Sequence, residues 1–268
     1  MKREIFRRLQ AEEAFHDLWA DNTDPEQIDV RRFFESPTAL ENRYARSMMG
    51  DVKGKRVLDI GPGLGESSIC FALDGASVTA VDVSAHMLAV LNTLAQKHGV
   101  AVATIHSIVE QAKLEPGSFD FAFVANALHH VGNRERFIEC IYGLLKPGGT
   151  AVFIDPLRYN PLINIYRWLA WKVRTVDEEP LGVRDFALFS QFQTVQHREF
   201  WLLSLLLFVK YFLVDWLHPN QERYWKRIYS ETEATLWWWK PLAAIDRRLT
   251  RLPIIRWLSW NTVVLATK

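Results

Sequence analysis

The chain has 268 residues and a formal net charge of +1, with 32 basic against 31 acidic residues. This length suits one large α/β domain with insertions, and the near-neutral charge provides no long-range field to attract nucleic acid. Cys70 and Cys140 offer neither a disulfide framework nor metal-ligand spacing, which is typical of a reducing compartment. The charged start at Met1 has no apolar signal-peptide core, so we expect a cytoplasmic protein without a metal site.

Two helices are expected in the first 50 residues. Residues 4–20 are amphipathic, residues 21–37 are expected to be a loop with the breakers Asp24-Pro25 and Ser36-Pro37, and a second helix runs from Leu40 to Gly50. Thr38 and Glu41 match a capping box for that second helix.

Apolar runs then alternate with helical patterns. The expected strands cover 57–60, 77–83, 102–106, 119–126 and 150–155, with Lys146–Gly149 as a tight turn before the last. The intervening helices cover 67–73, the stretch from Ser84 to Gly99, and the stretch from Asn133 to Leu145. This alternation predicts a doubly wound parallel sheet, whose ligands bind at the carboxyl ends of the strands.

The second half differs in composition, because ten of the 11 tryptophans follow residue 150. Residues 157–173 look helical, Thr194–Leu203 fit a strand, and Asn261–Lys268 fit a last strand. The apolar run over 205–217 is interrupted by charges and is shorter than the roughly 20 residues that a spanning helix needs.

A glycine turn follows the first strand, as Gly61-Pro62-Gly63-Leu64-Gly65. Asp59 lies inside that strand and Asp82 ends the next one, an arrangement that binds the adenosine part of a cofactor. A dinucleotide fingerprint has a third glycine where this chain has Glu66, which argues against a dinucleotide.

This segment resembles motif I of the class I S-adenosylmethionine (SAM)-dependent methyltransferases, and the likeness extends to Phe119–Val131 and Leu144–Thr150. It covers about residues 50–157. The resemblance implies an α/β fold with a doubly wound, mostly parallel seven-stranded sheet, an N-terminal helical lid and a large aromatic helical insertion before the last strand. The expected parts are the lid (1–50), the SAM-binding core (51–157), an aromatic and basic acceptor-binding region (158–260) and the last strand (261–268).

The resemblance also implies SAM as the cofactor, held by residues at the strand ends. Asp59 is expected to act on the methionine ammonium, directly or through water, and Asp82 on the ribose hydroxyls, and the glycines allow close backbone approach. Related enzymes usually have an acid at the adenine, where this chain has Ser107, or Glu110 after a register shift. The full expected set is Asp59, Gly61, Gly63, Gly65, Asp82, Val83, Ser107 and Asn126.

His129 and His130 follow the fourth strand, in the loop that faces the transferred methyl group in this family. A histidine suits deprotonation of a hydroxyl, an effect typically worth about 10²–10⁴-fold. Either histidine can be this base, or one of the pair can serve only in packing.

Two further groups of residues have both a functional and a structural interpretation. His16, Trp19, Glu41 and Tyr44 belong to helices that fold over the SAM cleft in this family, either excluding water or simply packing. The charged loop with Arg174, Asp177 and Glu178 can fix a polar head group or can be a solvated loop.

The tryptophans and arginines near the C-terminus have the composition of a membrane interface, with arginines suited to anionic head groups. The alternative is an ordinary core or the wall of a large acceptor pocket. The residues concerned are Trp237–Trp239, Leu242, Ile245, Arg247, Arg248, Leu249, Arg251, Trp257 and Trp260.

The sequence therefore predicts a SAM-dependent methyltransferase for a small lipophilic acceptor such as a quinone or lipid, peripheral at the inner membrane face. One alternative uses the same fold and SAM for another transfer, such as amino donation to a quinone. A second alternative is a non-catalytic SAM-binding protein. Nucleic acid is not expected as a partner, because the chain has no basic tract and no Asn/Asp-Pro-Pro-aromatic motif after the fourth strand.

Overall fold

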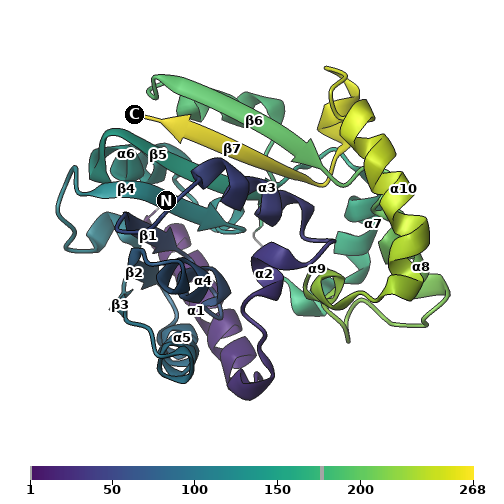
Figure 1. The fold of residues 1–268 in the computed structure, drawn as a ribbon, viewed down its shortest axis with the longest axis horizontal. Helices are drawn as coiled ribbons and strands as arrows, with labels where there is room; N and C mark the ends of the chain where they lie inside the picture. Colours follow the sequence, from purple (N-terminus) through teal and green to yellow (C-terminus); the bar gives the residue numbers. More distant parts are fainter. Residues whose placement is uncertain (1, 176–177) are drawn as a thin grey trace.

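The computed structural model describes residues 2–175 and 178–268. They form a seven-stranded sheet of order β3-β2-β1-β4-β5-β7-β6 with helices around it (Figure 1). Strand β7 is antiparallel to β5 and to β6, whereas β1 to β5 pair in parallel. This confirms the predicted doubly wound α/β class. The strands are β1 Arg56–Ile60, β2 Ser77–Asp82, β3 Val102–His106, β4 Phe119–Ala125, β5 Leu145–Pro156, β6 Thr194–Phe200 and β7 Asn261–Thr267.

Helices cover both faces of the sheet. A hydrophobic core lies on each face, and consecutive residues of β1 point into different cores. Val57 packs with residues of α4 and α5, whereas Leu58 packs with residues of α6. The helices are α1 Lys2–Asp21, α2 Arg32–Glu35, α3 Leu40–Met49, α4 Glu66–Leu73, α5 Ala85–His98, α6 Arg134–Leu144, α7 Pro161–Leu169, α8 Leu206–Leu213, α9 Tyr224–Arg227 and α10 Glu233–Leu249.

Local signals place most helix ends correctly. The Ser84 hydroxyl accepts from the backbone N–H of Met87 at 3.0 Å, and the Asn133 side chain accepts from that of Arg136 at 3.1 Å. Gly99 ends α5 in the left-handed conformation, with φ of 65°.

The predicted capping box of α3 is wrong. The Thr38 hydroxyl donates to the Ile228 carbonyl, and Ala39 occupies the N-cap position. Glu41 is buried and accepts from Trp201 Nε1 and Asn261 Nδ2, both at 2.7 Å. Partners far along the chain therefore satisfy both side chains that local geometry would assign to the cap.

Two other local predictions change in the structure. Helix α2 lies inside the predicted loop, because Phe34 is buried against Phe71 and Phe123. The predicted turn over residues 146–149 lies within β5, where the pairing with β4 shifts register between Phe119 and Phe121.

The aromatic region contributes a strand to the sheet as well as helices. Strand β6 lies within the predicted 158–260 region and ends before Trp201, whose φ is 69°. The Asp246 carboxylate of α10 accepts from the backbone N–H groups of Leu202, Leu203 and Ser204 and from the Ser204 hydroxyl, at 2.6–3.0 Å. This fully bonded carboxylate ties α10 to the end of β6.

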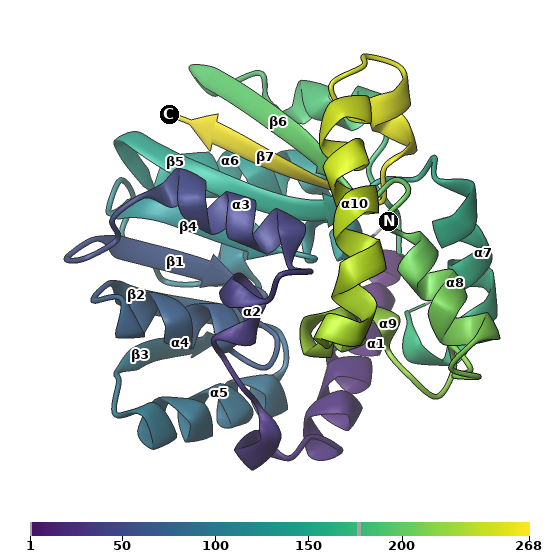
Figure 2. The same cartoon turned by 45° about the vertical axis from the view of Figure 1, so that its right-hand side comes forward.

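Helices α7, α8 and α10 gather at one end of the sheet (Figure 2). Trp239 and Trp260, for which the sequence left a membrane interface and an ordinary core open, are buried around Trp201. Within the described ranges, none of the helices combines the length and apolar character required to cross a membrane.

Candidate active site

A cavity of about 460 Å³ opens at the carboxyl ends of β1, β2 and β4. The strand order reverses between β1 and β4, which is where ligands bind in doubly wound sheets. Its wall comes from α1, the glycine turn, the segments after β2, β3 and β4, and the start of α6. The lining residues include Arg8, Glu12, His16, Gly61, Gly63, Asp82, Val83, Ser107, Ile108, Glu110, Asn126, His130, Asn133, Arg136 and Phe137.

Each of the three turn positions favours glycine for a different physical reason. A Cβ on Gly61 would lie 2.9 Å from Ala127 Cβ, and one on Gly65 would lie 2.7 Å from Leu91 Cγ. A Cβ on Gly63 would meet no protein atom within 4 Å, although its φ of 56° favours glycine. Gly61 and Gly63 line the cavity, whereas Gly65 is explained by its packing against α5.

Asp82 lies at the end of β2 and faces the cavity. Its carboxylate accepts from the Ser84 backbone N–H at 2.8 Å, and burial raises its pKa. Val83, Ser107 and Asn126, which are expected to bind the cofactor, also line the cavity. Glu110 lines it too, so both residues considered for the adenine position lie at the wall.

Asp59 does not line the cavity. Its carboxylate accepts from the Ser67 and Ser68 hydroxyls at 2.7 and 2.6 Å, at the start of α4. Burial raises its pKa to about 6, although the two hydroxyls act to lower it. Asp59 therefore fixes the helix that follows the glycine turn, and direct contact with SAM stays a prediction.

The two histidines differ in their position. His130 lines the cavity, and His129 lies behind it, with ring centroids 4.1 Å apart. His129 is buried, and its backbone N–H and Nδ1 lie 3.1 and 2.7 Å from Asp155 Oδ1. Burial lowers the pKa of His129 and raises that of Asp155 to about 7, so burial favours the neutral form of each group.

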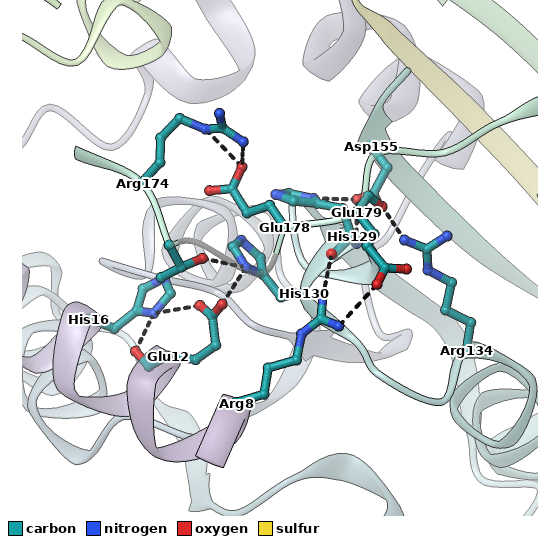
Figure 3. A network of polar contacts seen from close by, with 11 residues as sticks. Arg8, Glu12, His16, His129, His130, Arg134, Asp155, Arg174, Glu178 and Glu179 are labelled. Atoms are coloured by element: carbon teal, nitrogen blue, oxygen red, sulfur yellow. Dashed lines mark hydrogen bonds and ion pairs between the residues drawn. The ribbon is translucent and has the colours of Figure 1, made fainter. Parts of the chain in front are cut away.

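Helix α1 supplies the wall opposite the glycine turn, through Arg8, Glu12 and His16. Glu12 Oε1 lies 2.9 Å from His130 Nδ1 (Figure 3). No local sequence signal distinguishes Glu12 from other helix carboxylates, and the sequence analysis missed it.

The other predicted lid residues lie outside the cavity. Glu41 is engaged with Trp201 and Asn261, and the Tyr44 ring packs against Phe200 with centroids 5.4 Å apart. Trp19 packs against Trp225 of α9. Of the segment predicted to be a lid, α1 therefore lines the cavity, whereas α3 packs against β5 and β7.

Glu178 lies beside the two histidines, between them and Arg174 (Figure 3). Glu178 pairs with Arg174, and Arg8 donates to the His129 carbonyl at 3.3 Å. Burial acts to raise the pKa of Glu178, but the two histidines and Arg174 leave it below its usual value. Asp177, predicted in the same charged loop, lies outside the described residues.

His129, His130 and Glu178 bring potential metal-ligand atoms within 4.8 Å of one another. The sequence analysis did not foresee this grouping, because Glu178 belongs to an irregular loop. The Arg174 guanidinium already compensates the Glu178 charge, which weakens its attraction for a cation.

The cavity fits SAM on its own features. Gly63 leaves open space for close approach, and buried Asp82 offers acceptor oxygens to the ribose hydroxyls. Glu12, 5% exposed, adds a carboxylate suited to a cationic ligand. The strand order, the glycine turn and Asp82 at the end of β2 are those of class I methyltransferases.

Comparison with known proteins indicates the same class of enzyme. A family profile described as a methyltransferase domain matches residues 58–153. The ubiquinone biosynthesis O-methyltransferase of Pectobacterium carotovorum is 31% identical over 62% of this chain and 67% of its own length. That of Sodalis glossinidius is 34% identical over 58% of this chain and 61% of its own length. The chain belongs to the class I SAM-dependent methyltransferases.

A solved SAM-dependent methyltransferase from Mesorhizobium loti shares the fold, with a TM-score of 0.53 and 21% identity over 85% of this chain and 97% of its own. The chain spans less than two thirds of the length of the Sodalis protein. The comparisons therefore establish the family, and the acceptor requires its own argument.

The raised pKa of Asp59 predicts a pH-dependent effect of Asp59→Asn. Because the folded pKa of about 6 exceeds the ordinary 3.8, the stabilising contribution is complete below pH 3.8 and is lost as the pH rises through 6. The variant does not titrate, so its unfolding free energy relative to wild type should rise by about 1–2 kcal/mol between about pH 5 and about pH 8. Urea unfolding at both pH values measures this difference, and a constant difference would contradict it.

Proposed function

We propose that the protein methylates a hydroxyl group of a lipophilic, quinone-type acceptor with SAM. The observation that carries the proposal is a cavity suited to SAM with His130 in its wall. The similarity to ubiquinone biosynthesis O-methyltransferases supports a quinone-type acceptor and oxygen as the methylated atom.

When bound, SAM supplies a methyl group that passes from sulfur to the acceptor oxygen. Asp82 holds the ribose, and the turn at Gly61 and Gly63 allows the backbone to approach the cofactor. His130 is the better placed base, because it lines the cavity while His129 lies behind it. His130 takes the hydroxyl proton as the oxygen is methylated.

Removal of the Asp82 carboxylate should weaken cofactor binding about a hundredfold, because two hydrogen bonds to a charged group are lost. Calorimetric titration of Asp82→Ala with SAM and S-adenosylhomocysteine measures this loss. Asp51→Ala, an exposed acid outside the cavity, is the matched control. Failure of the wild type to bind either ligand would refute the proposed function.

His130→Ala should lower the methylation rate about 10²–10⁴-fold at saturating SAM, the usual contribution of a general base. The assay follows methyl-labelled SAM into the organic phase of a membrane lipid extract and of a decyl-substituted hydroxybenzoquinone in its oxidised and reduced forms. Exposed His218→Ala is the control. A full loss in His129→Ala with little loss in His130→Ala would transfer the role to His129.

Product mass separates this reaction from its alternatives. Methylation adds one CH₂ unit to the acceptor and yields S-adenosylhomocysteine, whereas amino donation adds nitrogen to the quinone and yields no S-adenosylhomocysteine. Cofactor binding without turnover of either acceptor source would favour the non-catalytic alternative.

The proposal includes docking on an anionic membrane surface through the outer face of α10. Trp237 is 73% exposed, and Ile245 and Arg248 follow at helical spacing on the same face. Arg247 and Arg251 are exposed nearby. An exposed tryptophan beside arginines suits the boundary between acyl chains and anionic head groups.

Flotation with phosphatidylglycerol vesicles tests membrane docking. The wild type should float at low salt, and Trp237→Ser combined with Ile245→Ser should reduce the floated fraction several-fold, because apolar area is lost. Leu18→Ser, an equally exposed apolar residue on α1, should leave flotation unchanged. A wild type that stays at the bottom would refute membrane docking without affecting the proposed chemistry.

A further inference from the structure

The histidine at the cavity wall receives its carboxylate partner from a distant part of the chain. Glu12 lies on α1, 118 residues before His130, and its Oε1 is 2.9 Å from His130 Nδ1. Glu12 is 5% exposed. Its second oxygen, Oε2, has no hydrogen-bond partner among the described residues and lies 3.8 Å from His16 Nδ1.

An ionised carboxylate can only accept hydrogen bonds, so it selects one form of a neutral imidazole. Burial acts to raise the pKa of Glu12, but the hydrogen bond and charge of His130 leave it below its ordinary value. Glu12 therefore draws the ring proton to Nδ1 and leaves Nε2 with a free lone pair. The Thr175 hydroxyl, 3.3 Å from the same Nδ1, is a weaker competitor.

The two histidines differ in where this partner comes from. Asp155, the partner of His129, ends β5 and belongs to the sheet. Glu12 reaches His130 only because α1 is docked across the cavity. The core can therefore orient His129 by itself, but it cannot orient His130.

The docking of α1 depends on contacts outside the cavity. The Trp19 ring packs edge-on against Trp225 at 5.2 Å, and the Arg223 guanidinium lies 4.7 Å from the Trp19 ring centre. The Ser84 hydroxyl donates to Asp17 at 2.5 Å. These contacts join α1 to α9 and to the start of α5.

We propose that Glu12 is a positioning residue that fixes the Nδ1–H tautomer of His130, so that the base is ready only when α1 covers the cofactor. The inference rests on the proposed function, because it assigns His130 as the base. It links closure of the site to its chemistry, since the same helix excludes water and sets the proton of the base.

Histidine-selective ¹⁵N labelling tests the tautomer directly. Long-range ¹H–¹⁵N spectra are recorded on the 268-residue chain with and without saturating S-adenosylhomocysteine, and His130 is assigned by its loss in His130→Gln. His130 should show a protonated Nδ1 and an unprotonated Nε2 in the wild type. Glu12→Leu should shift the ring toward the Nε2–H form, while the neighbouring control Glu13→Leu should leave it unchanged.

A kinetic measurement separates positioning from direct cofactor contact. In Glu12→Leu, turnover at saturating SAM should fall about 10–100-fold, part of the contribution of a general base. Affinity for SAM and for S-adenosylhomocysteine should stay within about threefold, a change below 1 kcal/mol. A large affinity loss with an unchanged tautomer would overturn the proposal and make Glu12 a cofactor contact.

A second variant covers failure of Glu12→Leu to fold. Trp19→Ala leaves Glu12 in place and removes the ring that holds α1 against α9, and it should also raise the Nε2–H population of His130. An Nε2–H tautomer in the wild type, or no change in either variant, would overturn the proposal. The tautomer is measured without turnover, so its result is independent of whether a quinone is the acceptor.

Discussion

The close approach of the strand ends at Gly61 and Ala127 is the constraint on which the site depends. A side chain at Gly61 would place its Cβ 2.9 Å from that of Ala127, so the two turns can meet only if residue 61 is glycine. The backbone N–H of Asn126 donates to the Ile154 carbonyl at 2.7 Å, which fixes the second turn against β5. Asp82, Asn126 and His130 converge because these neighbouring turns begin at one edge of the sheet.

A second set of buried polar groups joins the aromatic region to the rest of the fold. Glu41 joins α3 to Trp201 and Asn261, and Asp246 joins α10 to the turn after β6. Glu66 at the start of α4 pairs with Lys226 of α9, which connects the helix after the glycine turn to the region that also holds α1. Breaking such a buried partnership is costly, because it leaves an uncompensated polar group.

The core was predictable because its signals are local. Alternating apolar runs, the caps at Ser84 and Asn133, and the glycine turn act within a few residues, and the structure has each of these elements. The capping box at Thr38 failed for the opposite reason, since Ile228 and Trp201 provide partners that no local pattern reveals. For Trp239 and Trp260 the sequence left both a core and a membrane interface open, because composition cannot tell a buried tryptophan from one at a membrane interface.

The candidate site also combines residues placed by local signals with residues placed by contacts from distant parts of the chain. The glycines, Asp82, Ser107 and Asn126 follow strand ends, so their convergence could be inferred from the order of elements. Glu12 and Glu178 reach the histidines from a helix and a loop that are remote in sequence. Their positions depend on how the outer segments dock, and that is decided by tertiary packing alone.

The buried carboxylates suit a cofactor that carries positive charge. Burial penalises an ionised carboxylate by itself, but the same low dielectric strengthens its attraction for a cation placed beside it. In the proposed reaction His130 gains a positive charge as the cofactor sulfur loses one. Glu12, which bonds to His130, can therefore stabilise the positive charge that the ring gains on transfer. This favours methyl transfer, because the proton can stay on His130 and does not have to pass to solvent through the docked helix.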